Sequence, residues 1–435
     1  MYNIQTITVI GANGTIGSQI VKLLGVKTSA KVFLVCRTKK KAIQTIKGIT
    51  SFMDDTPLLG VLVPCDYSEL GQCVAKSDWV FESVAEDLSV KLDINRQIDS
   101  YLGPDTIVST GTSSFSIELL ASSFQEATRT HYFGTHFFNP PDKLPLLEFV
   151  NTKWSDPDSS LGFYRYLRET LDRQSVTTND VPAFLANRIG VLFLNEVAQL
   201  AEEYSDRGGI DYLDAIMGTH TGRMLAPLKT IDYIGIDVFE AIVKNLDGAG
   251  EPCFKSLYIP QFLNQLLSKR YLGRKCGIGL YKMEVVPDGS KTKLVYDIKR
   301  KTYRPLQKYN IPFVEAMTNH LKHGRIKESF AILMADLSDE AVICRYLLVR
   351  YIVVSYLVAL EAADRLSSAD LAMEYGYGWI PPRKLVSLLG GYAGLEMILL
   401  KDKRLRQSLE GFDLALLKYF CQEVTEDDMR FFRIS

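Results

Sequence analysis

The sequence predicts a doubly wound parallel α/β sheet followed by an all-α domain. In the first third of the chain, short β-rich apolar runs alternate with helical stretches, and parallel strands need such crossover connections. A glycine-rich turn follows the first run. From about residue 181, apolar residues recur at helical spacing instead. A chain of 435 residues has room for roughly two to four domains of ordinary size.

Each element follows from a local pattern. The expected strands are residues 6–12, 30–36, 59–64, 79–84 and 106–109, then 131–138 and 146–150. The last two flank a proline-rich loop and can pair as neighbours. The expected helices include residues 88–102, 183–204 and much of 312–366. The polar, charged stretch at residues 287–304 is the best candidate for a linker.

Composition narrows the class of protein. The 50 basic and 51 acidic side chains give a net charge of −1, which argues against a nucleic-acid-binding role. The most apolar run, residues 341–360, contains Arg345, Arg350 and Ser355, so we expect no membrane span. The N-terminus lacks the charged start of a signal peptide. Seven scattered cysteines without a C-x-x-C pair indicate reduced thiols, a cytoplasmic protein and no metal site.

The glycine turn has the spacing of a nucleotide-binding loop, lengthened by one residue. Gly11, Gly14 and Gly17 follow the first strand and open a helix. Such glycines allow a tight turn, a close backbone approach to a pyrophosphate and tight helix–strand packing. We therefore expect these glycines, with Thr15 and Ile16, to bind a dinucleotide in a Rossmann-type domain. The alternative is a plain tight turn.

The position that would contact the cofactor's ribose holds a basic amino acid. About twenty residues past the last glycine, an acid would select NAD. The sequence has Arg37 there, followed by Thr38 and three lysines. A guanidinium suits a 2′-phosphate, so these residues favour NADP. The alternative is an ordinary solvated basic face.

His136 differs from the other four histidines in its setting. It stands in the run GTHFFNPP, and Glu148 follows twelve positions later. Four further motifs appear in order: FESVAEDLSVK at 81–91, GTSSFS at 111–116, PAFLANR at 182–188 and GRKCGIGLY at 273–281. Together these motifs resemble the L-3-hydroxyacyl-CoA dehydrogenase family, with Gly111 in place of the family's Asn.

The chemistry of that family requires a base. Oxidising a 3-hydroxyacyl thioester removes the hydroxyl proton while hydride leaves the carbon for a nicotinamide. His136 can accept the proton because imidazole titrates near neutral pH. Glu148 would hold the ring in one tautomer and stabilise the imidazolium.

The resemblance also implies roles for four other residues. Ser113 and Asn187 would hydrogen-bond the reacting oxygen of the substrate. Glu86 and Lys91 would lie near the nicotinamide half of the cofactor. Without the resemblance, Ser113 would be interpreted as a helix N-cap and Asn187 as a polar contact at a helix start.

Two similar segments of the sequence predict a duplicated helical domain. Residues 195–218 and 360–376 each join a helix containing Glu and Ala to a second short helix. The alternative is chance similarity of two amphipathic helices. The expected domains are a cofactor-binding domain at 1–181, a helical domain at 182–285 and its second copy at 286–435. The resemblance implies the same arrangement, as in the dehydrogenase part of multifunctional β-oxidation proteins.

The sequence therefore predicts an oxidoreductase that interconverts (S)-3-hydroxyacyl-CoA and 3-oxoacyl-CoA. The family implies NAD as the cofactor, whereas Arg37 and Thr38 favour NADP, and both remain open. An acyl-CoA thioester is the expected partner, and the chain would be a monomer or a homodimer. Two alternatives keep the fold: a dehydrogenase for carrier-protein-bound or other hydroxy acids, and a cofactor-binding protein without catalysis.

Overall fold

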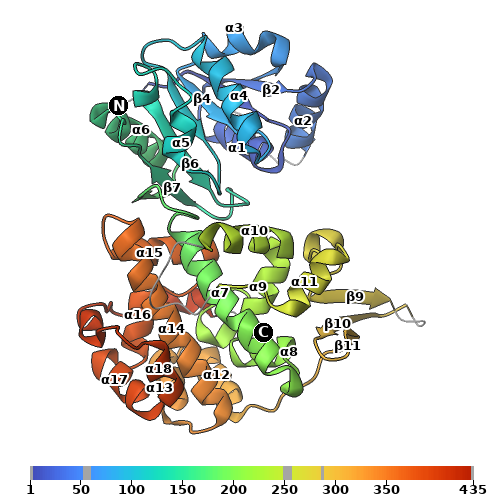
Figure 1. Cartoon of the computed structure of the whole chain (residues 1–435), viewed down its shortest axis with the longest axis vertical. Helices are drawn as coiled ribbons and strands as arrows, with labels where there is room; N and C mark the ends of the chain where they lie inside the picture. The colour runs from blue at the N-terminus through green and yellow to red at the C-terminus, as the bar shows by residue number, and fades with distance from the viewer. Residues whose placement is uncertain (1–2, 52–59, 248–256, 286–288, 433–435) are drawn as a thin grey trace. The chain divides into compact units, whose positions relative to one another are not determined.

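A computed structural model of the chain divides by its contacts into two compact units (Figure 1). The N-terminal unit comprises Met1–Leu185 and Glu361–Gly376, and the helical unit comprises Ala186–Leu360 and Tyr377–Ser435. The predicted division into three domains stays a prediction. The structure describes residues 3–51, 60–247, 257–285 and 289–432.

The N-terminal unit is built on one eight-stranded sheet with the order β3-β2-β1-β4-β5-β6-β7-β8. All neighbours are parallel except β6 and β7, which are antiparallel. The expected pairing of 131–138 with 146–150 is confirmed. The strands are β1 (Thr6–Ile10), β2 (Lys31–Cys36), β3 (Val61–Asp66), β4 (Trp79–Glu82), β5 (Ile107–Thr110), β6 (Tyr132–Phe137), β7 (Leu146–Val150) and β8 (Gln174–Thr178).

Helices cover both faces of this sheet, as a doubly wound fold requires. One core joins the sheet to α1, α2 and α6 through apolar side chains such as Leu24 and Phe163. The other joins it to α3, α4 and α5 through side chains such as Ile94 and Leu120. The helices are α1 (Thr15–Lys27), α2 (Lys39–Ser51), α3 (Leu70–Val74), α4 (Leu88–Asp99), α5 (Ile117–Ala121) and α6 (Pro157–Glu169).

A late segment of the chain completes the N-terminal unit. Ala363 forms a β-bridge with Thr178 at the end of β8, and the Asn179 N–H donates to the Ala362 carbonyl at 2.9 Å. The short helix α15 (Ser367–Ala372) follows. Part of the region expected to be a second helical copy therefore packs with the eight-stranded sheet.

The helical unit is dominated by helices, as predicted from residue 181 onward. They are α7 (Ala186–Glu203), α8 (Ile210–Ile216), α9 (Pro227–Ile234), α10 (Ile236–Leu246), α11 (Gln261–Ser268), α12 (Pro312–Lys322), α13 (Ile326–Ala335), α14 (Asp339–Ala362), α16 (Pro382–Leu388), α17 (Gly391–Lys401) and α18 (Lys403–Ser408). By length and hydropathy, α14 could cross a membrane, but 89% of its most apolar window is buried within the protein. The absence of a membrane span stays a prediction.

The predicted linker at 287–304 is wrong. Most of this stretch forms an antiparallel sheet of β9 (Tyr281–Val285), β10 (Lys291–Asp297) and β11 (Thr302–Pro305), and residues 287 and 288 lie outside the described residues. Leu294 and Val295 in the middle of β10 are buried, whereas lysines occupy more exposed positions. The exposed basic residues of this stretch therefore lie at the start of β10 and in the turn at residues 299–301.

Two loops of the helical unit meet at a buried guanidinium. Arg223 and Trp379 pair as an antiparallel bridge. The fully buried Arg223 side chain lies 4.3 Å from the ring of Phe193 on α7, 4.8 Å from that of Tyr351 on α14 and 4.2 Å from that of Trp379. Contact with aromatic faces stabilises a cation that burial has stripped of water. The guanidinium thus joins the aromatic side chains of α7 and α14.

Candidate active site

His136 and Glu148 face each other across β6 and β7. The antiparallel register places the two residues directly opposite, so their side chains project on the same face of the sheet. The His136 Nδ1 lies 2.7 Å from the Glu148 Oε2. The Leu185 N–H donates to the other carboxylate oxygen at 3.1 Å. Glu148 is fully buried, so this carboxylate is held firmly behind the imidazole.

Ser113 lies on the other side of the imidazole. Its Oγ is 3.0 Å from the His136 Nε2. Because a carboxylate only accepts hydrogen bonds, Glu148 requires a hydrogen on Nδ1 of the neutral ring, which leaves the lone pair on Nε2. The rings of Phe138 and Phe184 lie 4.8 and 5.7 Å from the imidazole and limit its rotation. Ser113 is not an N-cap, because Ser116 caps α5.

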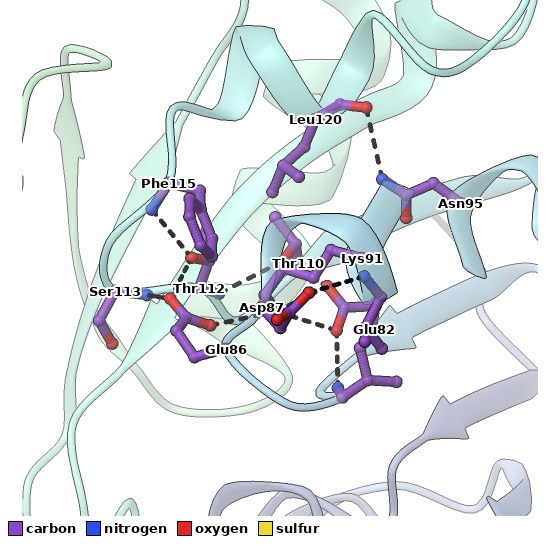
Figure 2. Close-up of polar contacts among 12 residues, drawn as sticks. Glu82, Glu86, Asp87, Lys91, Asn95, Thr110, Thr112, Ser113, Phe115 and Leu120 are labelled. Atoms are coloured by element: carbon purple, nitrogen blue, oxygen red, sulfur yellow. Dashed lines mark hydrogen bonds and ion pairs between the residues drawn. The ribbon is translucent and has the colours of Figure 1, made fainter. Parts of the chain in front are cut away.

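Glu86 holds the loop that carries Ser113 (Figure 2). Its Oε1 accepts from the Thr112 hydroxyl at 2.5 Å and from the Ser113 and Ser114 N–H groups at 3.1 Å each. Burial alone would raise the pKa of Glu86, but the charge of Lys91 and the hydrogen bond from Thr112 outweigh it, so the pKa lies below the usual range. Glu86 is therefore an ionised anchor for this loop.

Lys91 lies between two carboxylates, as Figure 2 shows. Its side chain is 1% exposed, and the ammonium lies 3.2 Å from Glu86 and 3.0 Å from Glu82. Glu82 ends β4 and is fully buried. The sequence motif named Glu86 and Lys91 but gave Glu82 no role. A buried acid at the carboxyl end of a parallel strand was the signal that could have found it.

The glycine loop has the geometry of a pyrophosphate site. Gly11 has a φ of +77°, and a Cβ there would lie 2.3 Å from the Ser83 carbonyl oxygen. A Cβ on Gly17 would lie 2.5 Å from the Gly11 oxygen, so helix and strand pack too closely for a side chain. Gly14 begins α1 without a side-chain cap, and no acid follows in the first turn through Thr15 and Ile16. This free, positive helix end fits a dinucleotide pyrophosphate.

The basic side chain at the expected ribose position, Arg37, is exposed to solvent. Arg37 directly follows β2 and is exposed, as is Thr38. In the described part of the chain, Arg37 forms no ion pair, whereas Lys39 pairs with Glu69 at 3.0 Å. The guanidinium is therefore available to a ligand. Among the same residues, no group of three or more His, Cys, Asp or Glu side chains could hold a metal ion.

Asn187 belongs to the helical unit. It is the second residue of α7, and its Oδ1 accepts from the Tyr377 hydroxyl at 3.1 Å. The structure thus brings Ser113, His136 and Glu148 together within the N-terminal unit. Asn187 is positioned by its own unit, and its contact with substrate stays a prediction.

The N-terminal unit therefore combines a tight glycine loop with an oriented imidazole near the carboxyl ends of its strands. Such an arrangement suits a proton transfer coupled to hydride transfer.

Two family models match the chain: the NAD binding domain of 3-hydroxyacyl-CoA dehydrogenase over residues 6–181, and the C-terminal domain of the same enzyme over residues 184–283. The chain belongs to the 3-hydroxyacyl-CoA dehydrogenase family.

Individual relatives agree with this assignment. A probable 3-hydroxyacyl-CoA dehydrogenase of Bacillus subtilis is 31% identical over 73% of this chain and 39% of its own length. The mitochondrial hydroxyacyl-coenzyme A dehydrogenase of Sus scrofa is 30% identical over 56% of this chain and 74% of its own length. The chain spans only 39%, 52% and 59% of the lengths of three bacterial relatives.

The fold extends over nearly the whole chain. The crystal structure of 3-hydroxybutyryl-CoA dehydrogenase from Escherichia coli K12 matches 96% of this chain and all of its own, with a TM-score of 0.68 and 19% identity. At this identity, the likeness concerns the fold alone. It includes the region beyond residue 283, where the family models end.

Proposed function

We propose that this protein interconverts (S)-3-hydroxyacyl-CoA and 3-oxoacyl-CoA with a nicotinamide cofactor. The observation that carries the proposal is the hydrogen-bonded series of Ser113, His136 and Glu148. The Ser113 Oγ lies 3.0 Å from the His136 Nε2, and the Glu148 Oε2 lies 2.7 Å from the His136 Nδ1. A histidine between a hydroxyl and a buried carboxylate can move a proton at its Nε2. The family membership supplies the substrate class.

In the oxidation direction, the substrate hydroxyl would hydrogen-bond to Ser113 and give its proton to the His136 Nε2. Glu148 would then stabilise the imidazolium through Nδ1, as its 2.7 Å contact allows. The nicotinamide, when bound, supplies the hydride acceptor. In the reverse direction, the same nitrogen returns the proton to the ketone oxygen.

We propose NAD as the preferred cofactor. The N-terminal half of the match is to an NAD binding domain, which supports NAD. The exposed Arg37 is the opposing feature, because an unpaired guanidinium attracts a 2′-phosphate. NADP is therefore the second candidate.

The assay follows the absorbance of NADH and of NADPH with acetoacetyl-CoA and with longer 3-oxoacyl-CoA substrates. We expect turnover by the wild type and a loss of about 10²–10⁴-fold in kcat for His136→Ala, the usual contribution of a general base. The matched control is His323→Ala, because His323 is exposed at the end of α12.

Three results would contradict the proposal. The first is no turnover at any chain length, and the second is full activity of His136→Ala. The third is turnover only when the acyl group is carried by an acyl carrier protein, which would establish the alternative substrate. Tight cofactor binding without any turnover would identify a non-catalytic cofactor-binding protein.

A further inference from the structure

Glu82 is a buried carboxylate with four polar contacts, at the point where β4 ends (Figure 2). Its Oε1 accepts from the Val84 N–H at 2.6 Å and from Lys91 at 3.0 Å. Its Oε2 accepts from the Thr110 hydroxyl at 2.7 Å and from Lys91 at 3.1 Å. A buried charge in such a position is costly unless it is fully paired, and both oxygens of Glu82 are.

The lysine is fixed in turn by the two carboxylates. Because Glu82 binds Lys91 with both oxygens, the ammonium has little freedom along α4. Its remaining contact is to the Oε2 of Glu86 at 3.2 Å. A lysine is otherwise a flexible point charge, so the paired acid determines where that charge lies.

The lysine position determines the position of Glu86. Lys91 holds one oxygen of Glu86, while the other accepts from Thr112, Ser113 and Ser114. Ser113 then reaches the His136 Nε2 at 3.0 Å. A continuous series of polar contacts therefore runs from the end of β4 to the imidazole.

We propose that Glu82 is a positioning residue, which sets the location of the Ser113 hydroxyl through Lys91 and Glu86. This inference rests on the proposed function, because it assigns Ser113 a place beside the reacting oxygen. Glu82 touches neither His136 nor Ser113. It acts by holding the ammonium that holds Glu86, and misplacement of a catalytic group by about 1 Å costs on the order of 10²-fold in rate.

The test is Glu82→Gln, which keeps the size and removes the charge. With one carboxylate partner left, Lys91 would shift toward Glu86 and draw it away from the Ser113 loop. We expect kcat with acetoacetyl-CoA to fall at least about tenfold. The dissociation constant of NADH should change by a smaller factor than kcat, because the glycine loop and the ribose position are unchanged and only the nicotinamide end lies near Glu86 and Lys91.

Asp428→Asn is a matched control. Asp428 is also a fully buried carboxylate, paired with Lys384 at 2.5 Å and accepting from the Thr425 N–H at 2.7 Å. It lies near the C-terminus, in the helical unit. We expect this control to lower the melting temperature and leave kcat unchanged. A lower melting temperature with unchanged kcat in Glu82→Gln, or a loss confined to NADH affinity, would overturn the proposal.

A double variant covers the case in which Glu82→Gln fails to fold. Glu82→Gln with Lys91→Met removes both buried charges together, which is better tolerated than removing one. Glu86 again loses its anchor, so kcat should fall as in the single variant. Wild-type kcat in this double variant would also overturn the proposal.

A measurement without substrate separates this proposal from the proposed activity. The NMR resonances of the His136 ring, compared between the wild type and Glu82→Gln at one pH, report the Ser113 contact directly. We expect the Nε2 resonance to move, because the hydrogen bond between Ser113 and this nitrogen changes. An inactive wild type would refute the proposed activity. An unchanged Nε2 resonance would refute the positioning role.

Discussion

At the residue scale, we propose that Arg37 influences the choice between NADH and NADPH. It is exposed directly after β2 and, among the described residues, forms no ion pair. Arg37→Asp should weaken NADPH binding at least tenfold, because a charge-assisted contact becomes a repulsion, and should change NADH binding less. Fluorescence titration of both reduced cofactors measures the change.

The control makes the same charge change at a residue on α2, away from the end of β2. Lys47→Asp alters an exposed lysine near the end of that helix. Lys47→Asp should have the same ratio of NADH to NADPH affinity as the wild type. If Arg37→Asp also leaves that ratio unchanged, the guanidinium does not contact a 2′-phosphate.

Single residues were predictable from sequence where a motif fixed their order. The spacing of His136 and Glu148 anticipated a pair that the structure places 2.7 Å apart. The position of Glu82 at the end of β4 gave a sequence signal, but its pairing with Lys91 was not predictable, because Lys91 folds back from α4 onto the end of β4. Such a contact joins residues nine positions apart across a loop, and no helical or strand periodicity encodes it.

At the scale of elements, the loop between β1 and α1 depends on its glycines. Gly11→Ala would place a Cβ 2.3 Å from a backbone oxygen, at a φ of +77° that side chains rarely adopt. The backbone must move, so we expect NADH affinity to fall at least tenfold and the melting temperature to drop. Isothermal titration and thermal unfolding measure these changes.

Gly48→Ala provides the contrast on α2. A Cβ at Gly48 meets nothing within 4 Å, and alanine favours a helix over glycine by up to about 1 kcal/mol. This variant should be as stable as the wild type or more so, with unchanged NADH affinity. Equal behaviour of the two variants would show that the loop tolerates a side chain.

Elements were predictable where their pattern was strong. The central strands β1, β2, β4, β5, β6 and β7 were identified, because buried strands of a largely parallel sheet are nearly continuous apolar runs. The edge strand β3 is less buried, but it too was recognised by its apolar residues. The last strand, β8, was missed because its sequence QSVTT is mostly polar. The stretch 287–304, which contains β10 and most of β11, was predicted as a linker for the same reason. In both cases, tertiary pairing outweighs a weak local signal.

At the scale of the whole molecule, buried ionisable groups make stability depend on pH. His220 is buried, and the loss of solvation lowers its pKa to about 4. The unfolded chain, with a histidine pKa near 6.5, then binds the proton more tightly than the folded one. Stability from this group is present above pH 6.5 and falls as the pH drops toward 4, by about 2 kcal/mol at pH 5.

Urea unfolding at pH 7 and pH 5 tests this dependence. His220→Gln removes the titrating ring, so its free energy of unfolding should fall less between the two pH values than that of the wild type. His323→Ala, at an exposed site, should follow the wild type. Identical pH dependence of His220→Gln and wild type would contradict the assignment to His220.

The late part of the chain completes both units. We propose that residues 286–435 derive from a second copy of the helical domain, as supported by the similar order of features at residues 195–218 and 360–376. Phe193 on α7 contacts Tyr351 on α14, with the ring centroids 5.6 Å apart. Within the helical unit, Glu196 on α7 also forms a buried ion pair with Arg350 on α14 at 2.9 Å. Within the N-terminal unit, the segment Glu361–Gly376 extends the structure beside β8. Both units therefore contain residues from this late region of the chain.

A chain truncated after residue 285 should therefore fail to form a stable protein, although both family models end by residue 283. The cut leaves β9 without its partner β10, and Glu196 buried without Arg350. Losing one partner of a buried ion pair typically costs about 3–5 kcal/mol, a large share of the stability of an ordinary domain. Expression, thermal unfolding and the acetoacetyl-CoA assay compare the truncated and full chains. A soluble truncated chain with wild-type kcat would show that residues 286–435 are dispensable, and that the buried contacts of α14 add nothing essential to the fold.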